Sequence, residues 1–598
     1  MPDNQKKIVP INYTNREYDS IREDLLEIAQ RFYPNTFQDF SEGSFGSLML
    51  DAVSYVGDQL SFYLDYNVNE SFLDTAFQFN NIVRHGKVLG YNYEGTSSVY
   101  GQVTLFVLVP ASATGIGPDL RYAPILRRGS SFSAANGSSY ILLDNVDFSN
   151  PQNDKVVARV NDSTGAPTFY AIKAFGNVVS GFYGIENITV GPYERFRSIR
   201  LRNSNISEIM SVIDSEGNEY FEVDNLSQDL IFEEVGNPNY KDDNVPSILK
   251  PRLVSRKFIL NLSRNAAFLQ FGSGESITSN VAANPQDVAM NLYGKDYVVD
   301  TSFDPTKLLK NQNFGISPSN TTLTVTYRAN NSISENISTG AITKVKNARF
   351  NFTNEQRLSV TTVSSVEKSL EVFNEQPLIG SVSTPSSDEI KRRIFDNFSA
   401  QNRAVTQTDY ESMALSMPKK FGSVKRVSVQ KDQNSLKRNL NMYVISESPS
   451  GKLTQTNLTI KNNLKTWLNH YRMINDTIDI LDPFIINIGI DFVIRTAPNI
   501  NKYDALAGAL TALQNNYQDP FYIGESFIIS DIYQVLKNTE GVLDVLSVKL
   551  VNKKGSSYSG NVLSINDNMS PEGNELVCPK NAVFEIKFPR VDIVGKVR

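Results

Sequence analysis

Residues 47–67 repeat one pattern of polar and apolar positions every seven residues: SLMLDAV, SYVGDQL, SFYLDYN. Each block begins with serine and has aspartate at its fifth position, whereas nearly all other positions are apolar or aromatic. Residues seven apart lie almost in line on an α-helix, so the serines and aspartates form one narrow polar stripe. A surface helix usually shows the reverse, an apolar stripe on a polar cylinder. The pattern therefore predicts a helix with neighbours on at least two sides.

Those neighbours come either from the chain's own core or from other chains, and the pattern alone leaves both open. The three aspartates are about 10 Å apart along the helix axis, so they cannot share a metal ion, and salt bridges or water are their expected partners. If the neighbours are other chains, the helix presents a partner interface. The residues expected at that interface are Leu48, Asp51, Tyr55, Asp58, Phe62, Tyr63 and Asp65.

Helix-capping residues predict further helices within the first 95 residues. Asp39, Ser41 and Ser44 offer N-cap oxygens to the heptad helix, which is expected to run to about residue 74. An earlier helix is predicted over YDSIREDLLEIAQRF, after a capping box formed by Thr14 and Glu17. A third is expected over 75–88. Residues 1–95 thus form a predicted helical region that joins a bundle.

From about residue 96 the pattern changes to short β-type runs bounded by Gly, Asn, Ser and Pro. Residues 96–380 are therefore predicted to form one or two β-rich middle domains, and the lack of a fixed period argues against a propeller or solenoid. Residues 381–598 alternate helices with strands and end in a β tail, which indicates C-terminal α/β sandwich units. The expected fold class is α+β and multidomain. The helices expected in this last region cover 386–401, 408–417, 455–471, 502–516 and 530–538.

A weak internal repeat relates 408–429 to 530–548. Both segments begin with Ser or Thr followed by Asp, carry a tyrosine in the first turn, and enter a strand after a turn. Thr408 and Glu411 suggest a capping box in the first copy. Two such units are expected to share one sheet or to pack as a pair.

Composition excludes several function classes. The net charge of −6 and the short, isolated basic clusters argue against a nucleic-acid partner. No segment offers some 18 apolar residues for a membrane span, so no membrane partner is expected. Cys578 is the single cysteine, which excludes an intrachain disulfide and fits a reducing compartment.

Residues suited to catalysis are scarce. The only two histidines, His85 and His470, are far apart in sequence, which excludes a multi-histidine metal site. His85 is expected to act at a helix end, His470 to pack, and Cys578 to be inert. The glycine-containing stretches GSFGS (43–47) and FGSGES (271–276) lack the lysine of a phosphate loop and are expected to be turns. We therefore expect no enzyme activity, no metal and no cofactor.

Three segments resemble a known family. DFSEGSFGSLMLDAVSYVGDQLSFYLDYNVNESFLDTA (39–76) resembles the N-terminal signature of the large baseplate wedge protein of T-even-type contractile-tailed phages. NISEIMSVIDSEGNEYFEVDNLSQDLIFEE (205–234) is similar to the same family. RAVTQTDYESMALSMPKKFGSVKRVSV (403–429), with GVLDVLSV (541–548), resembles the wider baseplate J-like family of phage tails and contractile injection systems.

The resemblance implies a structural, non-enzymatic protein of the virion, located in the tail baseplate and made in the cytoplasm of a host bacterium. It implies two copies per wedge, hence a ring of twelve around the central hub. By the same resemblance, the N-terminal helices bundle with other baseplate wedge proteins, the C-terminal region dimerises, and the ring contacts the sheath initiator. Two other classes stay open: a virion-borne receptor-binding or polysaccharide-degrading tail protein, and an intracellular scaffold outside any virus.

Overall fold

The computed structural model divides the chain into two compact units, which are described separately. Unit 1 comprises residues 1–92 and 385–398, and unit 2 comprises 93–384 and 399–598. The structure describes residues 17–32, 41, 43–95, 97–112, 116–236, 247–263, 266–274, 314–332, 334–353, 355–432, 439–498 and 500–598.

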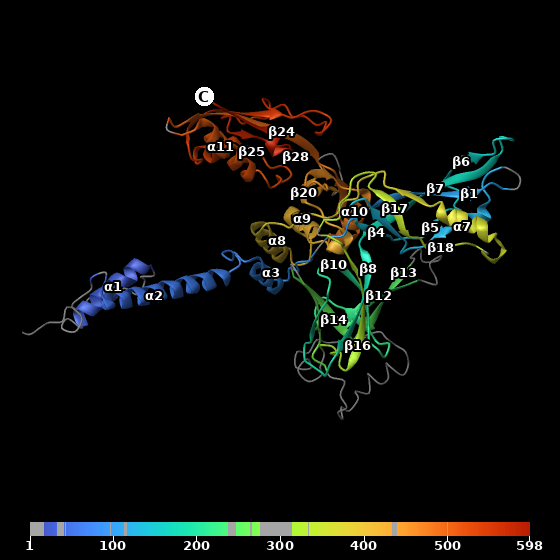
Figure 1. Cartoon of the computed structure of the whole chain (residues 1–598), viewed down its shortest axis with the longest axis horizontal. Coiled ribbons are helices and arrows are strands. Elements are labelled where there is room, and N and C mark those ends of the chain that lie inside the picture. Colours follow the sequence, from blue (N-terminus) through green and yellow to red (C-terminus); the bar gives the residue numbers. More distant parts are fainter. Residues whose placement is uncertain are drawn as a thin grey trace, which may run out of the picture. The chain divides into compact units, whose positions relative to one another are not determined.

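Unit 1 is helical, as the sequence predicts (Figure 1). The heptad helix ends at Glu70, four residues earlier than expected, and the third helix begins at Phe79 rather than at residue 75. A fourth helix comes from far along the chain and packs Ile394 against Gly86, where an added Cβ would lie 2.9 Å from the isoleucine Cδ1. The predicted capping residue Thr14 lies outside the described residues. The helices are α1 (Tyr18–Phe32), α2 (Phe45–Glu70), α3 (Phe79–Val88) and α8 (Ser387–Ala400).

Unit 2 begins with a seven-stranded sheet in the order β17-β3-β4-β7-β1-β19, with β6 beside β7. Strands β1 and β7 pair antiparallel along their length, from Tyr100↔Val179 to Pro110↔Phe169. Alternate side chains of β1 point into one core, which α7 covers with Val363 and Val366. The elements are β1 (Tyr100–Pro110), β3 (Ser131–Ala134), β4 (Ser139–Leu142), β6 (Asp154–Val160), β7 (Pro167–Ser180), β17 (Ile342–Asn347), α7 (Val360–Lys368) and β19 (Glu371–Phe373).

A second seven-stranded sheet follows in the order β8-β16-β10-β11-β14-β15-β9 and packs around its own hydrophobic core, which includes Tyr220, Phe258 and Phe271. Two further small sheets, β12-β13 and β18-β2-β5, lie outside it. The strands are β2 (Ile125–Leu126), β5 (Val146–Asp147), β8 (Phe182–Val190), β9 (Ser198–Arg200), β10 (Ile206–Ile213), β11 (Glu219–Glu222), β12 (Leu230–Gly236), β13 (Ser247–Leu253), β14 (Lys257–Ser263), β15 (Ala266–Phe271), β16 (Thr321–Ala329) and β18 (Phe350–Asn351).

The C-terminal part holds two four-stranded sheets, each covered by helices. In the third sheet β21 pairs with β20, β22 and β23, and in the fourth β24 pairs with β26, β28 and β29. A short pair, β25-β27, completes this part. The elements are α9 (Gln407–Leu415), β20 (Arg426–Lys431), β21 (Asn439–Glu447), β22 (Leu453–Gln455), α10 (Leu458–Leu468), β23 (Thr477–Leu481), β24 (Phe484–Thr496), α11 (Lys502–Asn516), β25 (Phe527–Ile528), α12 (Ile529–Lys537), β26 (Val542–Asn552), β27 (Glu575–Leu576), β28 (Ala582–Glu585), α13 (Pro589–Asp592) and β29 (Ile593–Val597).

The two copies of the internal repeat are α9-β20 and α12-β26. Each copy lies in its own sheet, so they do not share one. The predicted capping box at Thr408 and Glu411 is wrong. Thr406 is the N-cap residue: its side chain accepts a hydrogen bond from the Asp409 N–H, and the Asp409 carboxylate accepts one from the Thr406 N–H. Thr408 already lies inside the helix, where the backbone N–H groups it would cap are engaged.

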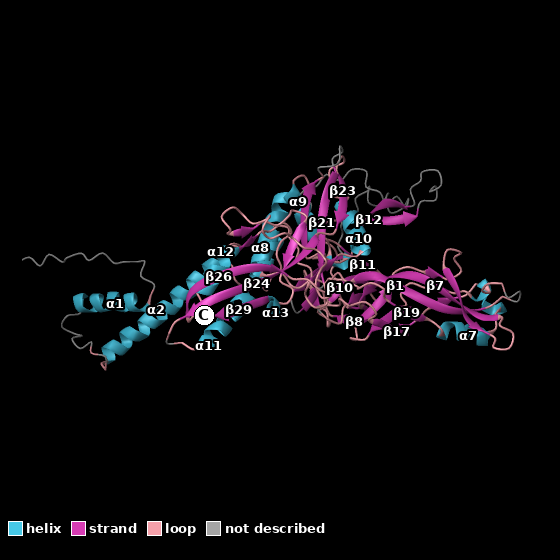
Figure 2. Cartoon of the chain, turned by 90° about the horizontal axis from the view of Figure 1, so that it is seen from above, coloured by secondary structure: helices cyan, strands magenta, loops and turns pink. Residues whose placement is uncertain are grey.

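The fold class is α+β and multidomain, as predicted, with helices at the N-terminus, a β-rich middle and α/β sandwich sheets at the C-terminus (Figure 2). One core takes Tyr100, Ile141 and Val179 from the β-rich part together with Ile460 and Leu464 from the C-terminal part. The division into 1–95, 96–380 and 381–598 therefore stays a prediction, since packing crosses its second boundary.

Candidate assembly interface on the N-terminal helices

Helix α2 begins where the sequence offers a cap. Ser44 has an extended backbone (φ −84°, ψ 152°), and its side chain accepts a hydrogen bond from the Ser47 N–H at 3.1 Å. This satisfies one of the N–H groups that a helix start leaves without a partner. Residues 45–47 of the stretch GSFGS are therefore helical, and the expectation of a turn is wrong for them.

The N-terminal part of the polar stripe of α2 faces α1. Arg22 forms an ion pair with Asp51 at 2.5 Å and donates a hydrogen bond to the Ser47 hydroxyl at 3.3 Å. Ser47 and Ser54 are 1% and 0% exposed, because small side chains allow the two helix backbones to approach closely. The Arg22 guanidinium lowers the pKa of Asp51. Figures 1 and 2 show α1 beside the N-terminal part of α2.

Most of the remaining α2 circumference is apolar and exposed. Eleven of its large hydrophobic side chains are between 48% and 71% exposed, whereas Leu50 and Tyr66 are half-buried. This reverses the usual distribution of a helix in a folded unit. Four of the predicted interface residues belong to this surface, whereas Asp51 and Asp58 are half-buried and Asp65 is exposed. The exposed residues are Phe45, Leu48, Met49, Val53, Tyr55, Val56, Leu60, Phe62, Tyr63, Leu64 and Val68.

The exposed apolar area of α2 is large for a monomeric protein. Phe45, Tyr55, Phe62 and Tyr63 are 57–71% exposed. At about 200 Å² for each ring side chain, these four alone expose roughly 500 Å². The largest apolar patch on a typical monomer is about 300–600 Å², and the aliphatic residues of α2 add to this value. Such a surface is typical of a site where another protein binds.

The far end of α2 is fixed to α3 by Glu70. Its carboxylate accepts hydrogen bonds from the Phe77 and Gln78 N–H groups at 2.8 and 3.1 Å and from the Asn81 side chain at 2.8 Å. These bonds, with that from Asn81 the largest contribution, lower the pKa of Glu70. His85 Nε2 donates to the Glu70 carbonyl oxygen at 2.8 Å, so this histidine joins two helices rather than capping its own.

The capping role of Glu70 was not predicted from the sequence. It caps a helix that begins nine residues later, and no local spacing rule connects a carboxylate to a cap at that distance. A second contact supports the same joint, because Lys391 of α8 donates to the Asp74 carbonyl oxygen at 2.8 Å. Together these contacts hold α3 and α8 against the end of α2.

The residues considered for chemistry lie apart from this surface. Cys578 is buried, and burial raises the pKa of its thiol to about 12. Both disfavour the reactive thiolate, and its lack of reactivity stays a prediction. His470 is exposed, so the expectation that it packs is wrong. Within the described ranges, no three or more His, Cys, Asp and Glu side chains gather as a possible metal site. None of the helices found there has the length and apolar content needed to cross a bilayer.

Comparison with known proteins gives one family match, over residues 17–88, to the N-terminal domain of bacteriophage baseplate proteins. No curated protein matches the chain. Among solved structures, the chain aligns with a chain of the anti-feeding prophage baseplate at 10% identity and a TM-score of 0.25, covering 94% of this chain and 89% of that one. A chain of the type VI secretion TssK-TssF-TssG baseplate subcomplex aligns at 9% identity and a TM-score of 0.25, covering 73% and 95%. TM-scores this low support no conclusion. The family match, in contrast, spans α1, α2 and α3, so the helices that carry the exposed apolar surface are similar to a phage baseplate domain.

Proposed function

We propose that this protein is a structural component of the baseplate wedge of a contractile phage tail, and that α2 is the core helix of a bundle formed with helices of other wedge proteins. The observation that carries the proposal is the distribution of side chains on α2, which contacts its own chain through small polar residues and exposes its large apolar ones. The family match over 17–88 supports the same role.

The geometry of α2 indicates how many partner helices it takes. At 100° per residue, the exposed apolar side chains extend over roughly 240° of the helix circumference. A single coiled-coil partner covers only a narrow stripe of two positions in seven. The surface therefore requires at least two partner helices in addition to α1. Because all of these exposed side chains are uncharged, the partner helices should present Leu, Val, Phe or Tyr at heptad spacing.

We also propose that the C-terminal region self-associates, with two copies per wedge and a ring of twelve that contacts the sheath initiator. The resemblance of 403–429 and 541–548 to the baseplate J-like family supports this part. Sedimentation of the full chain at micromolar concentration should give a mass above the 66.8 kDa of one chain. A strictly monomeric chain would contradict self-association but would leave the role of α2 intact.

The bundle is tested by replacing Tyr55 and Phe62 with alanine together. Full burial of such a ring is worth about 3–5 kcal/mol. Since both side chains are more than half exposed, the free chain should lose no more than ~1–2 kcal/mol per residue. An interface anchor costs ~2 kcal/mol or more of binding when truncated. The variant should therefore melt close to the wild type yet fail to co-purify with the other tail proteins.

A matched control is Tyr503→Ala, which removes an exposed ring from α11 in unit 2. It should melt normally and co-purify normally. A large fall in the melting temperature of the isolated double variant would show that these faces are internal, and unchanged co-purification would show that no partner covers them.

A further inference from the structure

Residues 484–598, named here the C-terminal module, have a hydrophobic core of their own. Every buried residue of this core lies between Ile486 and Ile593. Strand β24 runs through its centre, paired antiparallel with β26 and parallel with β28 and β29. The module therefore has the core of an independent folding unit.

The covalent connection to the preceding sheet is two residues long. Strand β23 ends at Leu481 and β24 begins at Phe484. Asp482 is fixed on the preceding side, because its carboxylate accepts hydrogen bonds from the Thr456 N–H at 3.2 Å and the Lys461 ammonium at 2.7 Å. A movement of the module relative to the third sheet must therefore turn about Pro483.

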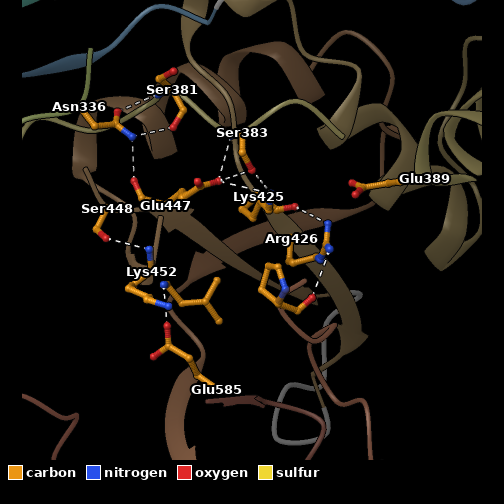
Figure 3. Close-up of polar contacts among 12 residues, drawn as sticks. Asn336, Ser381, Ser383, Glu389, Lys425, Arg426, Glu447, Ser448, Lys452 and Glu585 are labelled. Atoms are coloured by element: carbon orange, nitrogen blue, oxygen red, sulfur yellow. Dashed lines mark hydrogen bonds and ion pairs between the residues drawn. The ribbon is translucent and has the colours of Figure 1, made fainter. Parts of the chain in front are cut away.

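The junction between the third sheet and the module combines a small apolar cluster with polar contacts. The cluster has four buried residues among those that the structure describes, with three half-buried hydrophobic residues packed against them. The buried residues are Ile445, Leu453, Ile523 and Val583, and the half-buried ones are Tyr443, Ile485 and Phe521. Around it, Glu585 of β28 accepts a hydrogen bond from the Leu453 N–H at 2.8 Å (Figure 3). Arg426 of β20 donates to the Pro520 carbonyl oxygen at 3.2 Å and lies 4.3 Å from the centre of the Tyr522 ring.

The surface that receives the module is held rigidly. Glu447 of β21 pairs with Lys425 and accepts the Ser383 N–H at 3.0 Å. The Asn336 side chain donates to the carbonyl oxygens of Glu447 and Ser381, at 2.9 and 2.7 Å. Figure 3 shows these residues converging on one end of β21. The contacts tie the third sheet to the β-rich part of unit 2, so the sheet moves with that part and not with the module.

We infer that the C-terminal module is docked by a junction that opens while the module stays folded. Opening exposes one small apolar cluster, whereas unfolding exposes the whole core of the module. The polar groups at the junction regain water when they separate, so their net contribution to docking is modest. Interfaces between domains that are neither large nor hydrophobic permit relative motion by default.

Glu585 biases this equilibrium. In the docked state both carboxylate oxygens accept from neutral groups, the Leu453 N–H and the Asn487 side chain at 2.8 Å, and Glu585 makes no ion pair with any residue that the structure describes. Opening breaks the hydrogen bond from Leu453, which crosses the junction, and keeps that from Asn487, which lies within the module. Glu585 therefore favours the docked state through the Leu453 N–H.

Hydrogen exchange on the full chain tests the inference with Glu585→Gln. The Asn487 amide cannot turn over to suit the new side chain, because its oxygen accepts the Ser559 N–H at 2.7 Å. Glutamine then has one acceptor oxygen for two donors, and docking should weaken by roughly tenfold or more. We expect exchange to accelerate by that factor in peptides 450–456 and 518–524, while the centre of β24 exchanges as in the wild type.

Glu411→Gln is the matched control, because Glu411 also accepts a strand N–H, that of Val429 at 2.9 Å, but entirely on one side of the junction. It should leave both junction peptides unchanged. Tyr522→Ala, which removes the ring beside Arg426, should accelerate the same two peptides as Glu585→Gln. Acceleration spread evenly over 484–598 would overturn the inference, since the junction and the module would then unfold together. Unchanged exchange at the junction in both variants would overturn it as well.

Spin labels give a second readout. Cys578 is buried with a raised pKa, so labels can be attached at cysteines introduced at the exposed positions Lys465 on α10 and Ala507 on α11. In Glu585→Gln and Tyr522→Ala, a fraction of the molecules should show a longer distance between the two labels. The circular dichroism spectrum should stay unchanged. One unchanged distance in both variants would contradict an opening junction.

Discussion

Two ion pairs of equal length in this chain differ in burial. Removing one or the other should therefore lower the free energy of unfolding by different amounts. The Lys425 ammonium and the Glu447 carboxylate are 3.3 Å apart, with side chains 9% and 12% exposed. The Arg252 guanidinium and the Glu233 carboxylate are also 3.3 Å apart, but 45% and 55% exposed. Replacing each glutamate with glutamine removes the charge and nearly keeps the size. The glutamine oxygen at 447 can still accept the Ser383 N–H, so the two changes differ chiefly in the burial of the ion pair.

Glu447→Gln leaves the Lys425 ammonium buried without its anion, with the Ser383 hydroxyl as the acceptor that remains. Breaking a buried pair on one side costs about 3–5 kcal/mol of the free energy of unfolding, because the remaining charge is desolvated and uncompensated. Glu233→Gln exposes its former partner to water, so the loss should be at most about 1 kcal/mol. Adding Lys425→Met to Glu447→Gln removes the orphaned charge and should recover most of the loss.

Urea unfolding followed by tryptophan fluorescence measures these differences in the free energy of unfolding. Trp467 is the single tryptophan of the chain, and its indole N–H donates to the Met413 carbonyl oxygen at 2.8 Å beside the third sheet. The fluorescence therefore reports the unfolding of the part that contains Lys425. Equal losses for the two glutamine variants, or a double variant no more stable than Glu447→Gln alone, would refute the argument from burial.

Three further predictions concern Glu70, Cys578 and enzymatic activity. The lowered pKa of Glu70 means that its carboxylate stabilises the fold above its ordinary pKa of 4.5, and that this contribution is lost as the pH falls through the lowered pKa. Glu70→Gln should therefore melt below the wild type at pH 7, and the difference should shrink as the pH falls below 4.5. A difference that does not change with pH would contradict this. Cys578, with a pKa of about 12, should resist a maleimide at pH 8 until the chain is unfolded in guanidinium, whereas rapid labelling of the native chain would show it to be accessible. The pure protein should turn over neither ATP nor host envelope polysaccharide; turnover that one carboxylate substitution abolishes would favour the tail-enzyme alternative.

The sequence predicts local structure here because its signals are local. The heptads of 47–67 and the cap at Ser44 specify α2 within one segment, and the alternation of Val103, Leu105 and Val107 specifies β1 in the same way. Thr406 and Thr408 show the limit of such signals. Each is followed three residues later by an acidic residue, so the pattern fits both, and only the backbone reveals which of the two precedes the helix.

Long-range contacts leave no such signal. The position of α1 on the polar stripe depends on Arg22 reaching Asp51, and no spacing rule connects the two. The same holds for β16, which pairs with β8 and β10 from more than a hundred residues away, and for α8, which joins unit 1 from position 387. For the candidate interface, the sequence identifies the apolar residues of α2, whereas the side covered by its own chain emerges only from the fold.

The central claim is that helices of other chains cover the exposed faces of α2 in the assembled baseplate. A photoreactive amino acid at Tyr55 tests this most directly, with the free chain as the control. The account predicts that illumination of assembled baseplates joins this chain to a second polypeptide through Tyr55, and that the free chain forms no such product. Assembled baseplates in which Tyr55 reacts only within its own chain, or not at all, would contradict it.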